Sequence, residues 1–227
     1  MGLRAVPDGD EYDKDVALAI RYAVDNGADI VNMSFGKAYS PQKSLVDEAI
    51  KYAESKGVLL VHAAGNSSLD LDDSDNYPSD LMDDGTYANN VLTIGASTYY
   101  AKTKKAKNGY SNRSIPAYFS NYGKERVDFF APGHDIISTY TDNSYDKGSG
   151  TSYAAPVVSG IAALLKSYFP KMEAKDLKEV LMASTTDKNK VKVFLPGTSD
   201  KIKFSELSVT GGVVNAAAAV QLAMAKY

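Results

Sequence analysis

Cysteine is absent from this chain, which excludes disulfide bonds, thiol catalysis and thiolate metal sites and leaves the redox compartment open. Long apolar runs are missing too, since none approaches the roughly 18 residues typical of a membrane span. The formal net charge is only -3, and no long run of lysine and arginine occurs. We therefore expect neither a membrane span nor a nucleic-acid partner. The first residues show no signal-peptide pattern, and we expect the chain to begin inside a fold.

The chain does contain enough apolar sequence for a substantial core. Of its 227 residues, 44% are hydrophobic and 23% are charged, which favours a single domain over 1–227 and excludes a disordered chain.

Short apolar strands alternate with helices along most of the chain. Ser40 and Pro41 offer an N-cap and a first-turn proline to a helix that Gly57 ends,. We expect strands over 30–35, 58–64 and 91–96, and helices over 15–26, 41–56, 153–169, 174–182 and 216–225, the last capped by Asn215,. Near-continuous apolar strands between helices predict an α/β fold of three layers, with a mostly parallel sheet and helices on both faces.

Two polar stretches interrupt this pattern. Residues 67–85 contain seven aspartates, and residues 101–114 are rich in lysine, asparagine and serine. Both lack periodicity, so we expect solvated surface loops, and removal of 67–85 should leave the sheet intact. The aspartates of 70–84 could offer oxygen ligands to calcium, but their spacing matches no EF-hand loop and no ligand residue is assigned.

Glycines and small residues over 148–156 lead directly into an apolar helix. Ser152 at this position would have its backbone N–H free of intrahelical acceptors, and the helix dipole favours negative charge beside it. Its hydroxyl could attack a carbonyl group while the developing oxyanion meets unpaired donors. Pro156 fits a first turn, where its missing N–H is not needed. For an isolated Gly-Thr-Ser, an ordinary N-cap serine is the more frequent interpretation.

Five segments in collinear order resemble characteristic blocks of the subtilases, the subtilisin-like serine proteases. Residues 150–156 match the nucleophile block Gly-Thr-Ser-x-Ala-x-Pro, and residues 63–66 (Ala-Ala-Gly-Asn) match the oxyanion-hole block. Residues 32–36 (Asn-Met-Ser-Phe-Gly) resemble the substrate-binding strand, and residues 119–123 and 131–133 resemble two further blocks. Five matches in order are more specific than any one of them.

The resemblance implies a role for each matched residue. Ser152 would be the nucleophile, and Asn66 would donate its side-chain amide to the oxyanion together with the Ser152 N–H. The segment of Ser34 would pair with an extended peptide or protein substrate as an added strand, and the pocket for the residue before the scissile bond would lie beside Asn66. The implied substrate-binding residues are Ser34, Phe35, Gly36, Ala64, Gly65 and Thr151.

The resemblance also implies that the chain is the later, partial piece of a subtilase catalytic domain, without the N-terminal part. In the family the catalytic aspartate and histidine precede the serine, and neither block occurs here. Of the two histidines, His62 is expected to be buried in a strand with a satisfied ring, and His134 to lie on a surface loop. Loss of the histidine costs a subtilisin roughly 10⁶-fold in kcat. We therefore expect the isolated chain to be inert.

The missing part of the domain is the expected partner of this chain. In subtilases the aspartate-bearing strand lies beside the strand that 30–35 resemble. We therefore expect residues 30–35 to have unpaired backbone groups and an exposed apolar face.

Other functions fit the sequence less well. A non-catalytic peptide-binding module with a degenerate protease fold is the main alternative, and the intact Ser152 and Asn66 argue against it. An α/β-hydrolase esterase needs a Gly-x-Ser-x-Gly elbow, which Ser152 lacks, and the carboxyl-type serine peptidases place an aspartate where Asn66 stands. By resemblance the protein would be secreted or located at the cell envelope and would require no cofactor.

Overall fold

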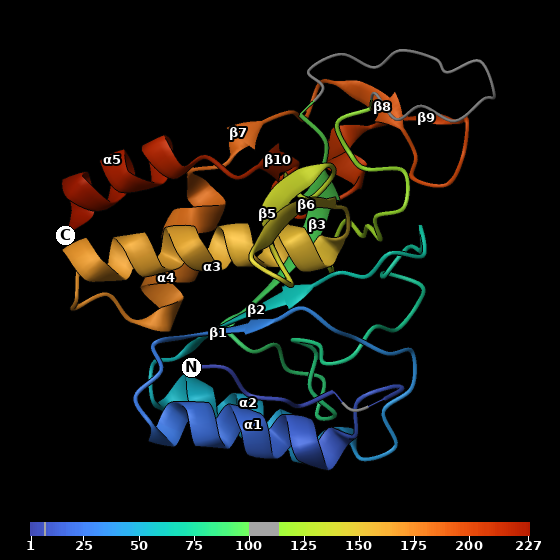
Figure 1. Cartoon of the computed structure of the whole chain (residues 1–227). Helices are drawn as coiled ribbons and strands as arrows, with labels where there is room; N and C mark the ends of the chain where they lie inside the picture. Colours follow the sequence, from blue (N-terminus) through green and yellow to red (C-terminus); the bar gives the residue numbers. More distant parts are fainter. Residues whose placement is uncertain (7, 100–113) are drawn as a thin grey trace.

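A six-stranded sheet organises the chain, for which a computed structural model describes residues 1–6, 8–99 and 114–227 (Figure 1). The strands follow the order β1-β2-β3-β4-β10-β7. All pairings are parallel except that of β7 with β10. Their bounds are β1 (Ile30–Met33), β2 (Leu59–Ala63), β3 (Val91–Ser97), β4 (Phe129–Pro132), β7 (Thr186–Asp187) and β10 (Gly212–Val213).

Helices cover both faces of this sheet. On one face lie α1 (Asp13–Asp25) and α2 (Lys43–Ser55), and on the other lie α3 (Thr151–Tyr168), α4 (Ala174–Ala183) and α5 (Ala216–Lys226) (Figure 1). A separate apolar core fills each interface, one including Ile50 and Leu60 and the other Leu92 and Leu165. Every residue of β2 and β3 is buried, because both faces of these central strands are covered. The predicted three-layer α/β fold is confirmed.

The predicted helix starts need two corrections. Helix α2 begins at Lys43 after Gln42, so Ser40 is not its N-cap; the Ser40 hydroxyl instead donates to the Asp13 carboxylate at 2.7 Å. Pro156 lies in the second turn of α3, not the first. Its missing N–H leaves the carbonyl of Ser152, four residues earlier, without its helical donor. The Asn215 cap of α5 is confirmed, since its side chain accepts the Ala218 N–H at 3.0 Å.

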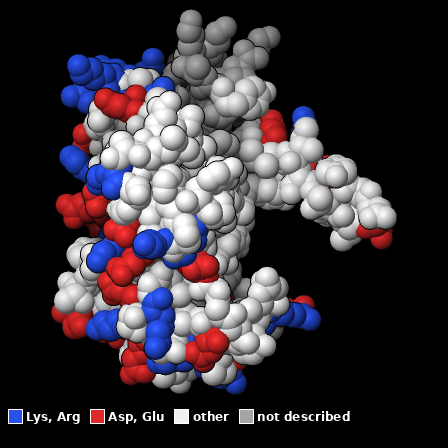
Figure 2. All heavy atoms as spheres, turned by 90° about the vertical axis from the view of Figure 1, so that its left-hand side faces the viewer, with Lys and Arg blue, Asp and Glu red and all other residues white. Residues whose placement is uncertain are grey.

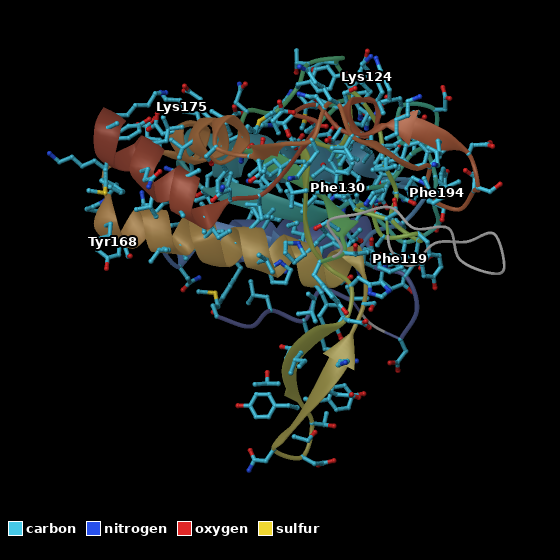
Figure 3. The ribbon with its side chains drawn as sticks, turned by 90° about the horizontal axis from the view of Figure 1, so that it is seen from above. Phe119, Lys124, Phe130, Tyr168, Lys175 and Phe194 are labelled. Carbon is cyan, nitrogen blue, oxygen red and sulfur yellow. The ribbon has the colours of Figure 1, made fainter. Side chains whose placement is uncertain are left out.

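One edge of the sheet is formed by β1, and one hairpin projects from the body. Strand β1 is an edge strand of the six-stranded sheet, paired there with β2, as the sequence predicts for 30–35. The exposed apolar face predicted for this strand is only partial, because Ile30 and Val31 are half-buried. Strands β5 (Ile136–Tyr140) and β6 (Ser144–Gly148) form an antiparallel hairpin that projects from the body (Figure 3). A smaller hairpin of β8 (Lys192–Phe194) and β9 (Lys201–Lys203) precedes the short helix η1 (Phe204–Glu206).

The acidic loop, residues 67–85, is not the solvated insertion that the sequence predicts. Met82 packs into the core under α1 and α2, and Leu71 belongs to a third apolar cluster around Phe130 and Phe204. Asp80 is buried and lies 3.9 Å from Arg126. The loop is therefore part of the fold, and its removal would open two cores. The other predicted loop, 101–114, lies outside the described residues except for Ser114, which is buried.

Charges of both signs are interspersed over the face seen in Figure 2, with no large field of one sign. Among the described residues, none of the helices combines the length and apolar character that crossing a membrane requires.

Candidate active site

The carboxyl ends of β1 and β2 meet the start of α3, and a cleft of about 400 Å³ opens between them. In parallel sheets covered by helices, this end of the strands is the usual position of a ligand site. Phe35 and Gly36 follow β1, Gly65 and Asn66 follow β2, and Ser152 is the second residue of α3; all five line the cleft.

Ser152 and Ser34 are joined by reciprocal hydrogen bonds. The Ser152 hydroxyl donates to the Ser34 carbonyl at 3.2 Å, and the Ser34 hydroxyl donates to the Ser152 carbonyl at 3.0 Å. The second bond replaces the helical donor that Pro156 cannot supply. The N–H of Ser152 belongs to the first turn of α3, where no intrahelical acceptor is available.

The amide of Asn66 is held in one orientation. Its Oδ1 accepts from the Thr151 N–H at 2.8 Å and from the Thr151 hydroxyl at 3.1 Å. That hydroxyl in turn accepts the Gly65 N–H at 3.0 Å. Because Oδ1 is occupied, the polar group left to Asn66 is its Nδ2 amide, a pure hydrogen-bond donor. The cleft thus contains a serine hydroxyl at a helix N-terminus and an oriented amide donor.

A family model described as the subtilase family matches residues 1–199. The chain belongs to the subtilase family. It is 40% identical over 153 residues to the thermophilic serine proteinase of Bacillus sp. (strain AK1), covering 67% of this chain and 32% of that protein. It is 32% identical over 206 residues to thermitase of Thermoactinomyces vulgaris, covering 91% of this chain and 59% of the relative.

Solved structures agree with this subtilase assignment. The prenylagaramide maturation protease PagA superposes with a TM-score of 0.68 at 28% identity, over 93% of this chain and 68% of that one. The chain spans between about a third and three fifths of the curated relatives it matches.

The structure brings most of the predicted subtilase site residues together, with one exception. Phe35, Gly36, Gly65 and Thr151 line the cleft beside Ser152 and Asn66, and Ser34 contacts Ser152 directly. Ala64 does not line the cleft. It is completely buried beneath it at the end of β2, where its carbonyl accepts from the amides of Asn121 at 2.8 Å and Asn76 at 3.1 Å.

Those two asparagines are site residues that the sequence did not reveal. Asn121 also accepts the N–H groups of Ser67 and Leu69, both at 2.9 Å, and so holds the turn that carries Asn66. Asn76 and Asn121 both line the cleft. Asn121 lies in one of the matched blocks, which was the available signal; no local pattern marks Asn76.

His62 cannot serve as a base for Ser152. It is 1% exposed, and its Nε2–H donates to the Phe35 carbonyl at 2.8 Å. Burial lowers the pKa of His62 to about 4, so the ring is neutral at pH 7,. The predicted buried position of His62 is confirmed. The prediction that its ring nitrogens have hydrogen-bond partners holds for Nε2 only, because Nδ1 has no partner among the described residues.

His134 is not the surface histidine that the sequence predicts. Its side chain is only 12% exposed, and the ring stacks on Phe119 with centroids 6.1 Å apart. Its Nδ1 lies 3.5 Å from the Asp135 carboxylate. The Ser152 hydroxyl meets a backbone carbonyl, and the described structure records no contact between it and either histidine.

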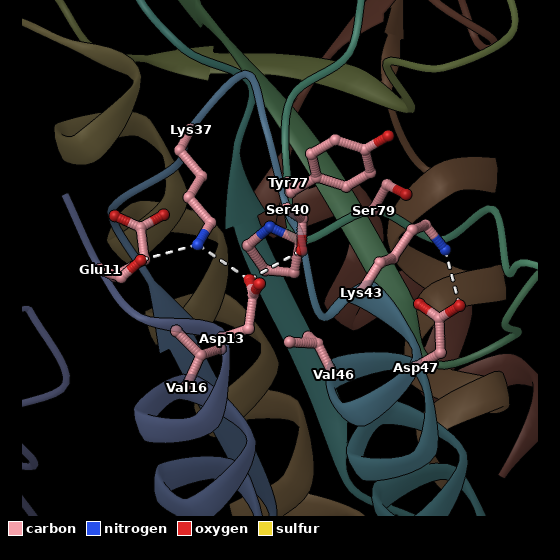
Figure 4. Close-up of a pocket in the computed structure, with 11 residues that line it drawn as sticks. Glu11, Asp13, Val16, Lys37, Ser40, Lys43, Val46, Asp47, Tyr77 and Ser79 are labelled. Atoms are coloured by element: carbon pink, nitrogen blue, oxygen red, sulfur yellow. Dashed lines mark hydrogen bonds and ion pairs between the residues drawn. The ribbon is translucent and has the colours of Figure 1, made fainter.

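A charged network anchors the chain just beyond Gly36 (Figure 4). The Lys37 ammonium lies 2.8 Å from the Asp13 carboxylate and donates to the Glu11 carbonyl at 2.7 Å. Burial raises the pKa of Asp13, but hydrogen bonds from Lys37 and Ser40 outweigh it and hold that pKa below its usual value. The enclosed space of about 10 Å³ is water-sized,. This network holds the wall of the cleft in place and pairs the positive charge of Lys37 with the Asp13 carboxylate.

Two carboxylates of the acidic loop, those of Asp72 and Asp84, accept hydrogen bonds from neighbouring segments. Asp72 accepts the backbone N–H groups of Lys124, Glu125 and Arg126 at 2.7 to 3.2 Å, and Asp84 accepts from Lys51 at 2.7 Å. Over the part of the chain that the structure describes, no group of three or more acidic or histidine side chains is placed to hold a metal ion. In this loop Asp72 acts as an anchor for the turn at 124–126.

Proposed function

We propose that this chain is the part of a serine endopeptidase that provides the nucleophile, Ser152, and the oxyanion donor, Asn66. The observation that carries the proposal is the fixed amide of Asn66, whose oxygen is held by the Thr151 N–H at 2.8 Å while Nδ2 remains for a ligand beside Ser152. Acyl transfer requires this pair of functions around one carbonyl group.

The chemistry follows from these positions. The Ser152 oxygen attacks the peptide carbonyl carbon, its proton passes to a base, and the carbonyl electron pair moves onto the oxygen, where the Asn66 amide and the Ser152 N–H stabilise it. As this intermediate collapses, the base gives the proton to the leaving nitrogen, the C–N bond breaks and the amine is released. Water then hydrolyses the acyl ester and restores the serine. Substrate backbone would lie along the Ser34 to Gly36 segment as an added strand.

We further propose that the base and its orienting carboxylate reach Ser152 from a segment outside these 227 residues, which is the predicted N-terminal partner. Two observations support this. Ser152 donates to the Ser34 carbonyl, and β1 is an edge strand that offers backbone groups beside the cleft. Calcium is proposed to play no part in this chemistry, since the acidic loop uses Asp72 to hold backbone N–H groups. By family resemblance we propose a secreted or cell-envelope protein, although one relative is described as the major intracellular serine protease of Bacillus subtilis (strain 168).

The experiment compares the isolated chain with the chain mixed with a polypeptide carrying subtilase aspartate and histidine blocks. The isolated chain should neither cleave peptide substrates nor react with a fluorophosphonate, and the mixture should do both. Ser152→Ala should abolish both in the mixture. Asn66→Ala should lower kcat about 10²–10³-fold, as loss of this donor does in a subtilisin.

Two results would change the conclusion. Substantial cleavage by the isolated chain would show that a base within it activates Ser152. A mixture that forms a complex and binds peptides but cleaves none would favour the alternative, a non-catalytic peptide-binding module.

A further inference from the structure

Asn76 lines the cleft and lies against both of its walls, the segments of Gly36 and Gly65. Its Nδ2 donates to the carbonyls of Ala63 and Ala64, both at 3.1 Å, so both amide hydrogens are used,. On the opposite wall, a methyl group added to Gly36 would lie 2.6 Å from the Asn76 Oδ1. The backbone of Gly36 therefore packs directly on the amide. Asn76 therefore occupies the space between the two walls.

The atom that Asn76 leaves to an incoming group is a hydrogen-bond acceptor. With Nδ2 committed to two carbonyls, its orientation is fixed and Oδ1 cannot exchange places with it. Among the described residues, no donor to this oxygen is recorded. An aromatic side chain pressed against such an oxygen would remove its contact with water without replacing the hydrogen bond, which is costly.

The charge in the cleft is negative. Lys37 and Asp75 are the charged residues that line it, but the Lys37 side chain is 10% exposed and paired with Asp13 at 2.8 Å. Asp75 is exposed and, within the described part of the chain, forms no ion pair. Its carboxylate accepts a hydrogen bond from the Tyr77 hydroxyl, and the pKa of Tyr77 is raised by burial and by Asp75. The nearby Arg126 side chain already faces Asp80.

We infer that Asn76 and Asp75 determine which substrate side chain enters this cleft, and that they select one ending in a hydrogen-bond donor. An amide or an ammonium group can donate to the Asn76 oxygen, and an ammonium also meets the Asp75 carboxylate. A carboxylate is repelled by Asp75, and a large aromatic ring has no donor for the Asn76 oxygen. The inference rests on the proposed function, which places the side chain before the scissile bond here.

The test measures binding of four unreactive peptides to the 227-residue chain, so it does not depend on catalysis. Acetyl-Ala-Ala-Xaa amides with Xaa as lysine, glutamine, phenylalanine or glutamate are titrated while NMR follows the backbone amides of Gly36, Gly65 and Thr151. Lysine and glutamine should bind more tightly than phenylalanine, and glutamate most weakly. The lysine peptide should bind about tenfold more tightly than the glutamate peptide at low salt. This affinity ratio should shrink in 0.5 M salt, where the Debye length is about 4 Å.

Two variants separate the contributions of the Asp75 charge and the Asn76 side chain to peptide binding. Asp75→Asn should bring the ratio of lysine to glutamate peptide affinities close to one. The glutamine peptide should still bind more tightly than the phenylalanine peptide. Asn76→Ala enlarges the cleft and removes the acceptor, so the phenylalanine peptide should bind more tightly than the glutamine peptide. Asp73→Asn, an exposed neighbour that does not line the cleft, is the matched control and should leave every ratio unchanged. Because Asp75 is exposed, its variant tests the charge without risk to folding.

The outcomes distinguish this inference from the proposed function. If the peptides bind at the cleft but phenylalanine is preferred, or if Asp75→Asn leaves the lysine-to-glutamate ratio intact, the inference is overturned and the endopeptidase proposal stands. If none of the four peptides shifts the cleft amides, the cleft does not receive a substrate chain and the proposed function itself fails.

Discussion

The buried carboxylate of Asp128 contributes to the pH dependence of the stability of this fold. Asp128 is 6% exposed, and its Oδ2 accepts the Thr93 N–H at 2.7 Å. Lys178 lies 3.6 Å away, and Asp80 and Arg126 are the other charged groups nearby. Burial raises the pKa of Asp128 to about 6, although Lys178 opposes the shift.

The sign follows from comparing the two states. Because the folded pKa of about 6 lies above the usual 3.8, the folded chain binds more protons at Asp128, and the contribution of Asp128 to the free energy of unfolding falls as pH rises from about 4 to about 6. The lowered pKa of His62 gives a contribution of opposite sign over the same range. Asp128→Asn keeps an acceptor for the Thr93 N–H. It should remove the Asp128 contribution, up to about 3 kcal/mol, from the pH dependence of the free energy of unfolding. Urea midpoints from pH 4.5 to 7.5 measure it, with the exposed Asp73→Asn as control. Equal slopes for Asp128→Asn and the unaltered chain would contradict the assignment.

At the scale of elements, the acidic loop behaves as part of the core although its composition is that of a surface segment. Met82 is 3% exposed among the residues of α1 and α2, and Leu71 is 4% exposed in the cluster of Phe130. Its exposed aspartates hold backbone groups of neighbouring turns. The loop therefore contributes to stability through two apolar anchors.

Met82→Ala should lower the free energy of unfolding by about 2–5 kcal/mol, because it leaves a cavity where a large side chain was buried. Asp73→Ala, an exposed change in the same loop, should stay within about 0.5 kcal/mol. Urea denaturation with and without EDTA measures both, and EDTA should shift neither curve. An unchanged free energy of unfolding for Met82→Ala would show that the loop does not contribute to the core. A urea curve shifted by EDTA would indicate that the loop binds calcium.

Elements dominated by apolar periodicity were predictable from sequence, and contacts between distant segments were not. The strand and helix positions of β2, β3 and α3 follow from runs of apolar residues. The N-cap at Ser40 was wrong because Asp13, far away in the chain, competes for that hydroxyl. Asn76 escaped detection because its role depends on the carbonyls of Ala63 and Ala64, which only the folded loop brings near it.

At the scale of the whole molecule, we expect the edge strand β1 to govern association of the chain in solution. An edge with free backbone groups is a template for pairing with another strand. Asn32 is the exposed residue of β1, and a lysine there would place a charge against any incoming strand.

We expect the isolated chain to associate as its concentration rises, and Asn32→Lys to suppress this association. Asn32→Ala, which removes the same amide without adding charge, should associate like the unaltered chain. Sedimentation velocity over a hundredfold range of concentration distinguishes them. Monomers at every concentration, or equal association of the lysine and alanine variants, would show that β1 is not the contact.

The proline in the second turn of α3 links two positions that no local pattern connects. Pro156 withholds a donor from the Ser152 carbonyl, and the Ser34 hydroxyl supplies it at 3.0 Å,. Pro156→Ala would restore a helical N–H that competes for the same carbonyl, and loss of the Ser34 hydroxyl beside an unchanged proline would leave that carbonyl unpaired. In natural sequence variation positions 34 and 156 should therefore change together, so that covariation between them records a hydrogen bond across the cleft.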